Sequence, residues 1–516
     1  MKEGRWRSHL PLALLWVATS ACFAWIFELG FTDTDALADV AAARVDSFSE
    51  FSRQLGIPLT DGVAGKNANF WRPTTMMQFV FLRAAFGWSA WGWHLWDLLL
   101  HLSCVGLVYA LMLSHSRKAA VVAASLFAFH PLTIEVVPAV ARSIDSLMTV
   151  LVLLCIWLAG RGWWRSALIC GALALGAKET AIVGLPMAMT YAWLQGKQQV
   201  AKTLLWGFSG VVVVFFLLRG QVLEGIGGYY ERETLHFGRL ESALQAAPLE
   251  LIAPGWSGFL SDMPGFSRML IAGFLWLGCA LWVWKKAREQ PILLVGFGLI
   301  ALSIGLFGVT GTYSRRLLYL PTAGLAFMAG AALSSRWGSA VLVLWFVSLL
   351  PASPLIHRDT SWQQNDALTD AMTWQLESTY AQLEPGTTIW MVDRPHRVDG
   401  SAVRQRLWTK GATLNNSVAG YSIQAWADDR FGEGWLRFET VSFSRPVGDF
   451  PTAKVGVDAD GVVVERPWVR RYRNLKSKLW QRKLEKNQMR LVPDASLRGD
   501  YLLVVGTPRS TLVALK

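Results

Sequence analysis

Long apolar blocks separated by short polar stretches dominate the first 356 residues, and a different pattern follows them. The first block covers residues 10–29, which is long enough to cross a membrane as a helix. Later blocks predict further helices at residues 92–113, 119–133, 144–160, 163–177, 180–195, 203–219, 268–284, 291–309, 316–334 and 337–355. Because most blocks are joined by short turns, the pattern predicts about eleven membrane-spanning helices.

Two longer polar stretches interrupt these blocks, at residues 30–91 and 220–267. The first contains a run with helical spacing, which predicts one helix over residues 36–51. The second is rich in glycine and tyrosine, at Gly225, Gly227, Gly228, Tyr229 and Tyr230. We expect this second stretch to be a mobile cover over a substrate.

The tail, residues 357–516, has the pattern of a small soluble domain. It predicts a helix and then strands, at residues 362–380, 387–392, 453–464 and 501–505. Residues 453–464 are expected to form a hairpin that turns near Asp460 and Gly461, and residues 501–505 the final strand. We therefore expect a membrane domain over residues 1–356 and a soluble α/β domain over the tail.

Composition agrees with a polytopic membrane protein. Of the 516 residues, 53% are hydrophobic and only 17% are charged, with a mean hydropathy of +0.32. A net charge of +12 would suggest a nucleic-acid partner in a soluble protein, but much of the Lys and Arg lies in short loops between apolar blocks. No nucleic-acid partner is therefore expected. The five cysteines all lie in apolar blocks and indicate nothing about redox compartment.

The placement of basic residues predicts the orientation of the chain. With the N-terminus in the cytoplasm, every inner loop is basic, with residues such as Arg117, Lys118, Lys197, Lys285 and Lys286. The same threading puts the two long loops and the whole tail outside the cytoplasm. The outer side would then also carry a group of ionisable residues from loops far apart in sequence: Asp33, Asp35, Arg72, His130, Glu135, Arg142, Asp145, Lys178, Glu179, Arg315 and Arg316.

Ionisable residues at a membrane edge are costly, so their convergence on one side indicates a function. Individually, several also have a structural interpretation. Asp33 or Asp35 would suit the N-cap of the helix that follows, and His130 before a proline would suit the end of a helix. Lys178 and Glu179 would suit a pair that satisfies itself at a helix junction.

Arg315 and Arg316 are harder to explain structurally. They lie at the outer edge, where the positive-inside rule disfavours arginine. An anionic partner is the economical explanation, because a planar guanidinium forms two parallel hydrogen bonds to phosphate or carboxylate oxygens.

Four motifs in order along the chain resemble those of GT-C glycosyltransferases: residues 70–75 (FWRPTT), 129–137 (FHPLTIEVV, followed by Arg142 and Asp145), 177–180 (AKET) and 314–321 (SRRLLYLP). The likeness covers roughly residues 10–335. It is strongest to the membrane half of transmembrane and tetratricopeptide-repeat-containing O-mannosyltransferases and their bacterial relatives. The resemblance implies an α-helical GT-C fold that takes sugar from a polyprenyl-phosphate donor on the extracytoplasmic face, with membrane lipids as surroundings.

The chain also departs from that family. Relatives carry adjacent acids in the first outer loop, whereas this chain has Asp33-Thr34-Asp35, so either carboxylate is a candidate, with Asp35 slightly favoured. The repeats are absent, so the hydroxyl acceptor, whether protein, lipid or polysaccharide, does not carry over. Without those repeats and with compact loops, the chain is expected in a bacterial inner membrane, with the tail in the periplasm.

The chemistry of such a transfer assigns roles to these residues. Asp35 or Asp33 would be the base for the incoming hydroxyl, with Glu135 and Asp145 orienting the acceptor or the arginines. The cations that would hold the donor phosphate are Arg315 and Arg316, with Arg72, Arg142 and Lys178 as weaker candidates. The supporting residues would be His130, Asp145, Glu179 and Tyr319.

Some alternatives stay open. No metal is assigned, because arginines alone can neutralise a lipid phosphate, but Asp33, Asp35 and Glu135 could hold a hard divalent ion. A transporter or flippase of lipid-linked sugars would also need an anion site, although transporters place such groups near the midplane of repeated halves. A noncatalytic scaffold would not need acids beside the arginines.

Two aromatic-rich stretches also allow two interpretations each. One follows Arg72 and contains Phe79, Phe81, Phe86, Trp88, Trp91, Trp93 and Trp96. It would suit an interfacial aromatic belt or a groove for a polyprenyl chain. The other, residues 468–490, mixes Lys and Arg with Trp and Leu, and would suit a solvated basic helix or a surface resting on anionic headgroups or an acidic glycan.

Overall fold

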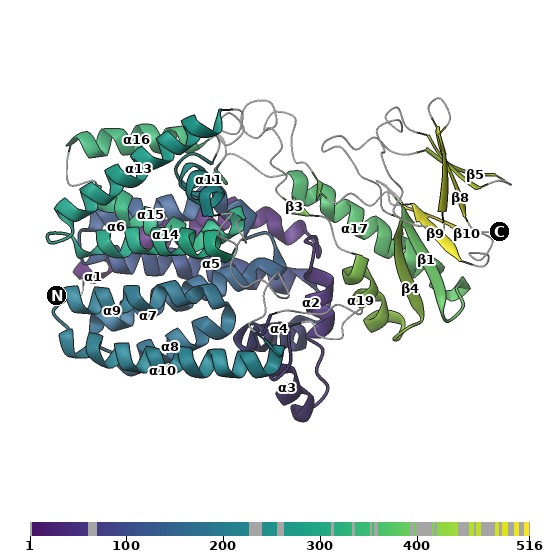
Figure 1. The fold of residues 1–516 in the computed structure, drawn as a ribbon, viewed down its shortest axis with the longest axis horizontal. Helices are drawn as coiled ribbons and strands as arrows, with labels where there is room; N and C mark the ends of the chain where they lie inside the picture. Colours follow the sequence, from purple (N-terminus) through teal and green to yellow (C-terminus); the bar gives the residue numbers. More distant parts are fainter. Residues whose placement is uncertain are drawn as a thin grey trace.

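Helices fill one part of the computed structural model and two β-sheets lie at its other end (Figure 1). The structure describes residues 3–59, 70–225, 240–254, 263–310, 314–332, 336–350, 353–355, 360–392, 397–398, 415–416, 420–441, 454–458, 461–465, 480–484, 488–493, 500–504 and 510–514. The N-terminus lies at the end of the helical part that is remote from the sheets (Figure 1).

Each of the predicted apolar blocks contains a helix. These are α1 (Glu3–Phe23) with η1 (Ala24–Glu28), α5 (Ala90–Leu113), α6 (Arg117–Phe129), α7 (Ser143–Arg161), α8 (Trp164–Ala177), α9 (Gly184–Leu194), α10 (Gln198–Leu223), α13 (Gly265–Lys286), α14 (Pro291–Thr310), α15 (Tyr319–Ala332) and α16 (Arg336–Leu349). Among the described residues, six helical segments are long and apolar enough to cross a membrane by length and composition. The chain is a multi-pass membrane protein, and the count of eleven crossings stays a prediction.

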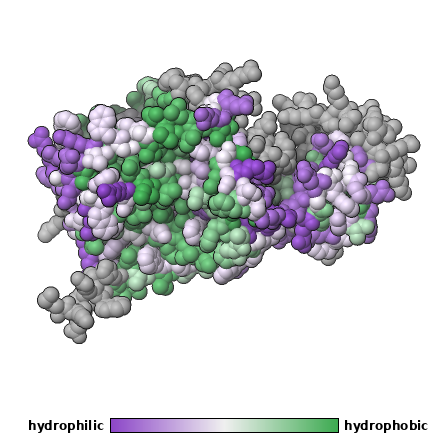
Figure 2. Space-filling model, turned by 90° about the horizontal axis from the view of Figure 1, so that it is seen from below, coloured by the Kyte–Doolittle hydropathy of each residue, from purple (hydrophilic) through white to green (hydrophobic). Residues whose placement is uncertain are grey.

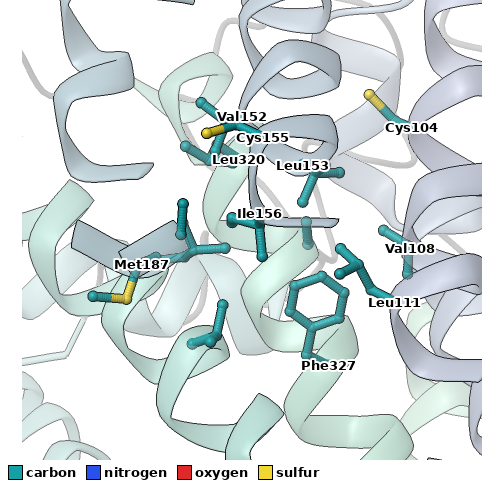
Figure 3. Close-up of a cluster of buried hydrophobic side chains, with 14 of the residues drawn as sticks. Cys104, Val108, Leu111, Val152, Leu153, Cys155, Ile156, Met187, Leu320 and Phe327 are labelled. Atoms are coloured by element: carbon teal, nitrogen blue, oxygen red, sulfur yellow. The ribbon is translucent and has the colours of Figure 1, made fainter. Parts of the chain in front are cut away.

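The centre of the bundle is closely packed. Cys104 and Val108 from α5, Leu153 from α7, Met187 from α9 and Phe327 from α15 point into one cluster (Figure 3). Helices α14 and α15 approach most closely at Gly296 and Gly324. A Cβ atom at Gly324 would lie 2.4 Å from the carbonyl oxygen of Gly296, so both positions must lack a side chain.

The outer face of the bundle is unusually apolar. Trp206 of α10, Phe274 and Trp284 of α13 and Leu344 of α16 are each more than 70% exposed. Hydrophobic residues form a broad band across the helical part, with hydrophilic residues toward both ends (Figure 2). In water such a surface would be a liability, so it is the lipid-facing belt of the protein.

The first long loop differs from its prediction. Residues 36–51 form not one helix but two, α2 (Ala36–Ala42) and α3 (Phe48–Leu55). The hydroxyl of Ser47 begins α3 by accepting a hydrogen bond from the Glu50 backbone N–H, 3.2 Å away. This local N-cap outweighs the continuous helical spacing. Helix α4 (Pro73–Phe86) follows, with proline at its first position.

The second long loop contains a helix that the sequence did not predict, α11 (Leu240–Ile252). It packs on α13 and α14, with Ala247 and Leu251 buried. The glycine- and tyrosine-rich part expected to be a mobile cover, from Gly227 to Tyr230, lies outside the described residues.

The tail is α/β, as predicted. Helix α17 (Thr360–Thr379) and strand β1 (Thr387–Val392) match their predicted ranges. One sheet has the order β10-β9-β1-β4, in which β4 (Leu436–Val441) and β9 (Tyr501–Val504) are parallel to β1. Residues 501–505 are not the final strand, because β10 (Thr511–Ala514) pairs antiparallel with β9.

A second sheet of the tail has the order β5-β6-β8-β7 and is antiparallel throughout. Strands β5 (Lys454–Asp458) and β6 (Gly461–Glu465) form the predicted hairpin. The alternative of a basic helix over residues 468–490 is wrong in its second half, which forms β7 (Trp480–Leu484) and β8 (Gln488–Pro493). The short strands β2 (Arg397–Val398) and β3 (Asn415–Asn416) pair separately, and residues 466–479 lie outside the described residues.

One apolar core is shared by the first loop and the tail, and we call it the loop–tail core. The first loop and the helices beneath it contribute Phe31, Leu37, Val40, Phe79 and Trp93. The tail contributes residues of α17, β1 and α19 (Gly420–Phe431): Leu368, Met372, Ile389, Ile423 and Trp426. Helices α17 and α19 accordingly lie between the bundle and the sheets (Figure 1).

Candidate functional site at the sheet-facing end of the bundle

Five of the predicted site residues, Glu135, Arg142, Glu179, Arg315 and Arg316, lie on short segments between the helices of the bundle: η3 (Pro131–Glu135), η4 (Val140–Arg142), η5 (Glu179–Val183) and η8 (Arg315–Leu318). Segment η3 packs against η8, and α11 packs against η8 as well. Residues separated by up to about 280 positions in the chain are thereby brought into one region, as the interactions below show.

Glu179 holds two arginines. Its carboxylate accepts hydrogen bonds from Arg72 Nε (3.1 Å) and Arg72 Nη2 (3.3 Å), and it lies 3.5 Å from Arg219 Nη2. Burial alone would raise the pKa of Glu179, but the charges of Arg72 and Arg219 outweigh it and lower the pKa to about 2. The predicted pairing of Glu179 with Lys178 is therefore wrong.

Lys178 pairs with Asp145 instead, with Nζ 2.5 Å from Oδ1 and both side chains less than 10% exposed. Burial lowers the pKa of Lys178, the charge of Asp145 opposes this, and the charges of Arg72 and Arg316 add to the lowering. The ammonium thus lies within electrostatic reach of both arginines.

Arg142 connects this group to the first loop. It donates a hydrogen bond to the carbonyl oxygen of Glu135, and its Nη1 lies 3.5 Å from Glu135 Oε2. The charges of Arg316 and Asp33 both act on Arg142, and its guanidinium lies over the ring of Trp362 from the tail, 5.4 Å from the centroid. Arg316 acts electrostatically on both Arg142 and Lys178, and Arg72 acts on Lys178, so we call these four residues the cation cluster.

Asp33 is a buried, fully engaged carboxylate. One oxygen accepts a hydrogen bond from the backbone N–H of Asp35 (3.2 Å), and the other accepts from the backbone N–H of Ala141 in η4 (2.9 Å). Burial raises the pKa of Asp33, and the neighbouring charge of Arg142 opposes that effect. Asp33 thus joins the first loop to the segment that carries Arg142.

Asp35 has a different environment. It occupies the N-cap position of α2, but its side chain makes no capping hydrogen bond. Instead its carboxylate accepts a hydrogen bond from the hydroxyl of Tyr421, in helix α19 of the tail. Asp35 is only partly buried, so it is the more accessible of the two acids.

Arg315 pairs with an acid on α11. Its Nε is 3.3 Å from Oε1 of Glu250 on α11. The next residues of that helix, Leu251 and Ile252, line a pocket of about 40 Å³ whose other walls are apolar side chains of α13, α14 and α15. Glu250 therefore fixes Arg315 of η8 against α11.

His130 and Tyr319 have structural partners. His130 ends α6 and begins η3, where its Nδ1 accepts from the Leu132 N–H (3.3 Å) and its Nε2 bonds the Leu251 carbonyl oxygen (3.0 Å). This agrees with the structural interpretation of His130. The Tyr319 hydroxyl bonds His101 Nδ1 at 2.7 Å inside the bundle.

Several residues of the site were not predicted. Arg219 lies in the long apolar helix α10, and Glu250 lies in α11, the helix that the sequence did not predict; the sequence alone gave neither residue a partner. Asp97 of α5 is 2% exposed, its charge is coupled to that of Asp33, and its Oδ2 has no hydrogen-bond partner among the described residues. Asp97 could have been found from the sequence, because a carboxylate within an apolar block indicates a functional residue.

The three acids considered for a divalent ion point to different partners: Asp33 to backbone N–H groups, Asp35 to Tyr421 and Glu135 to Arg142. Within the described ranges, no group of three or more His, Cys, Asp or Glu side chains is placed to hold a metal ion.

The chain resembles a solved structure of ArnT. This is the crystal structure of ArnT from Cupriavidus metallidurans bound to undecaprenyl phosphate, with a TM-score of 0.41 and 17% sequence identity. The similarity covers 65% of this chain and 62% of that chain, so less than two thirds of the length of ArnT is matched. No family model matches the sequence. The curated proteins contain no match to it either. The chemistry of the site therefore rests on its own residues.

Proposed function

We propose that the protein is an inverting membrane glycosyltransferase of the GT-C type, which moves a sugar from a polyprenyl-phosphate donor to a hydroxyl acceptor. The observation that carries this proposal is the gathering of the cation cluster beside the first loop, where Asp33 accepts a hydrogen bond from the backbone N–H of Ala141, the residue before Arg142. Cations gathered beside a carboxylate suit a reaction in which a phosphate leaves and a hydroxyl loses its proton.

The cation cluster suits the leaving group of this reaction. A polyprenyl-phosphate sugar is a phosphodiester with one negative charge, and breaking its glycosidic bond leaves a phosphomonoester that carries about −1.5 to −2 near pH 7. The charge of Arg316 acts on both Arg142 and Lys178, so an anion beside Arg316 would relieve the repulsion that it exerts on them. Interactions that strengthen as charge develops lower the barrier.

The first loop would supply the base. In a single displacement, Asp35 takes the proton of the acceptor hydroxyl, and the oxygen of that hydroxyl attacks the anomeric carbon. The electron pair of the breaking C–O bond passes to the phosphate. The partly exposed position of Asp35 supports this role, as does the hydrogen bond that it already accepts from a hydroxyl, that of Tyr421. Asp33 would position the loop through its bonds to Asp35 and Ala141.

Location and sidedness are part of the same proposal. The basic inner loops support a cytoplasmic N-terminus and a site on the extracytoplasmic face, in a bacterial inner membrane with the tail in the periplasm. The transferred sugar is a hexose, such as mannose, or a pentose, and the panel of donors below distinguishes the two.

The test uses purified protein in lipid and a panel of labelled polyprenyl-phosphate sugars, with and without a chelator, and with a cell-derived acceptor pool. Asp35→Asn should bind donor but lose turnover by roughly 10²–10⁴-fold, the usual contribution of a positioned base. Asp33→Asn should lose less turnover if it positions and more if it is the base. Asp46→Asn is the matched control, because Asp46 lies in the same loop and its side chain is 72% exposed.

Two outcomes would contradict the assignment. If wild-type protein binds donor but releases no sugar, a flippase of lipid-linked sugars becomes the better explanation, and transbilayer movement of the donor should then be measured. If a chelator abolishes turnover and a divalent ion restores it, the purely cationic neutralisation of phosphate is wrong.

A further inference from the structure

A second cavity lies where the first loop meets the tail, apart from the cation cluster. Its volume is about 280 Å³, just below the range of roughly 300–1,000 Å³ typical of small-molecule pockets. The first loop contributes Gly30, Phe31 and Leu37 to its wall, α17 contributes polar side chains, and α19 contributes Trp426. We call it the loop–tail pocket.

The lining of this pocket combines two kinds of chemistry. Two indole rings, Trp88 and Trp426, are accompanied by Asp370, Thr373, Glu377 and Arg430. Carboxylates accept hydrogen bonds from hydroxyl groups, a guanidinium donates to them, and a threonine hydroxyl does either. Indole faces offer broad apolar surfaces to C–H groups. A ring that carries hydroxyls at its edge and C–H bonds on its face, as in a saccharide, matches both.

Neighbouring contacts fix the indole of Trp88, whereas the charged groups of the pocket can exchange their partners for a ligand. The Trp88 Nε1–H donates to Asp429 Oδ2 at 2.7 Å, which holds the ring in place. The pair of Arg430 and Glu377 is only 3.1 Å apart, but the two side chains are 56% and 43% exposed. An exposed pair of this kind contributes little stability, so a ligand can replace one of its contacts at small cost.

Gly30 forms a closely packed part of the wall. Its N–H donates to Asp366 Oδ1 at 2.7 Å, and a Cβ atom at this position would lie 3.0 Å from that oxygen and 3.6 Å from Asp370 Oδ1. The glycine thereby keeps α17 close to the first loop and leaves Asp370 facing the pocket. The pocket exists only because the two parts of the chain are docked.

We propose that the loop–tail pocket binds a saccharide unit of the acceptor. The proposal rests on the proposed function, and it deepens it by naming the acceptor class. The wall of the pocket belongs to the same segment as Asp35, whose hydrogen-bond partner Tyr421 lies on the same helix as Trp426. A saccharide held here would contact Leu37, which lies two positions after the base Asp35 in the same loop.

The experiment uses the full-length protein in nanodiscs and saturation-transfer NMR with the methyl glycosides of glucose, galactose, mannose and N-acetylglucosamine. At least one glycoside should bind, and Asp370→Asn and Thr373→Val should each weaken its binding by threefold or more. Glu433→Gln, an exposed carboxylate in the turn after α19, is the control and should leave binding unchanged. The melting temperature of each variant shows that it is folded.

The pocket proposal is overturned if no glycoside binds above empty nanodiscs, or if the two pocket variants bind as wild type does. It is also overturned if an unstructured peptide binds there in place of the glycosides. Donor turnover, measured on the same preparation with water or acceptor as recipient, separates the two proposals. Glycoside binding without turnover removes the transferase and keeps the saccharide site, whereas turnover without glycoside binding does the reverse.

Discussion

At the scale of single residues, the site is built from ion pairs that hold arginines in place before any ligand arrives. Glu179 fixes Arg72 with two hydrogen bonds, and Asp145 and Glu250 each fix one cation. Burying such charges is costly unless they are paired and hydrogen-bonded, so loss of one carboxylate should leave its partner strongly destabilised. The same pairing keeps each guanidinium pre-oriented, which lowers the entropic cost of binding an anion.

Glu179→Gln should lower the free energy of unfolding by about 3 kcal/mol, because two largely buried guanidinium groups lose their anionic partner. The loss should be constant above about pH 4.5, since the lowered pKa of Glu179 keeps it ionised until the pH falls toward 2. Thermal unfolding in detergent measures it. Glu289→Gln, which breaks an exposed pair with Lys286, should change stability by less than about 0.5 kcal/mol. Equal effects of the two changes would refute the argument.

Asp366 gives the opposite dependence on pH. Burial and the nearby Asp370 raise the pKa of Asp366 to about 6, so the folded state binds a proton more tightly than the unfolded state. Stability should therefore fall as pH rises from about 4 to about 6, by about 1–2 kcal/mol for this partly solvated group, and stay level above that. Asp366→Asn, which can still accept from the Gly30 N–H, should remove this slope. Melting temperatures at pH 4.5 and pH 7 test it, and a slope that persists in the variant contradicts it.

The sequence predicted which ionisable residues would gather, but not their partners. That prediction used the expected sidedness of the loops, which was inferred from charge and hydropathy. Pairings depend on distance in space: Tyr421 lies 386 positions from Asp35, and Arg72 lies 107 positions from Glu179. No periodicity carries that information, so the adjacent pair Lys178 and Glu179 was matched wrongly.

At the scale of elements, the length of an apolar block predicted a helix reliably, whereas the effect of local capping on helix ends was not predicted. Each long apolar block contains a helix because backbone polar groups in lipid must be satisfied within the segment. The split between α2 and α3 depends on one serine, and α11 forms in a stretch where glycine and tyrosine nearby suggested a loop. Strands β7 and β8 form in a basic stretch because β8 pairs with β6 on one side and with β7 on the other, and this pairing outweighs helical spacing.

The contact between α14 and α15 makes a sharp prediction. Gly324→Ala would place a methyl group 2.4 Å from the Gly296 carbonyl oxygen, which forces the two helices apart. We expect a loss of roughly 1–3 kcal/mol from overpacking. Gly305→Ala on α14 is the matched control, because no atom lies within 4 Å of its Cβ position, and it should be neutral or slightly stabilising. The melting temperature of each purified variant distinguishes them; a neutral Gly324→Ala would show that the helices separate freely.

At the scale of the whole molecule, a lipid-facing bundle and a water-facing tail share the loop–tail core. Asp429 of α19 also joins the tail to the bundle and the first loop, because it accepts hydrogen bonds from Arg83 (2.7 Å), Trp88 (2.7 Å) and Arg44 (3.4 Å). The predicted division at residue 356 therefore separates two folding patterns but not two independent cores. A shift in composition along the chain reveals where the folding pattern changes, but it does not reveal whether the two parts have separate cores.

The orientation can be tested in intact cells. In a variant without native cysteines, a membrane-impermeant maleimide should label Glu433→Cys and should not label Lys197→Cys until the membrane is opened. The expectation follows from the basic inner loops and from the position of the tail at the end of the bundle opposite the N-terminus (Figure 1). Labelling of Lys197→Cys alone would invert the proposed topology and move the site to the cytoplasmic face.

The loop–tail core also changes how truncations of this protein should be interpreted. Removing residues 357–516 would uncover Phe31, Leu37 and Val40 on the aqueous side of the membrane, where they now contact the tail. A shortened chain would then tend to aggregate or be degraded, and its inactivity would say nothing about acceptor choice. Exchanging side chains within an intact tail separates recognition from folding, and grafting the tail onto another bundle would require grafting the first loop with it.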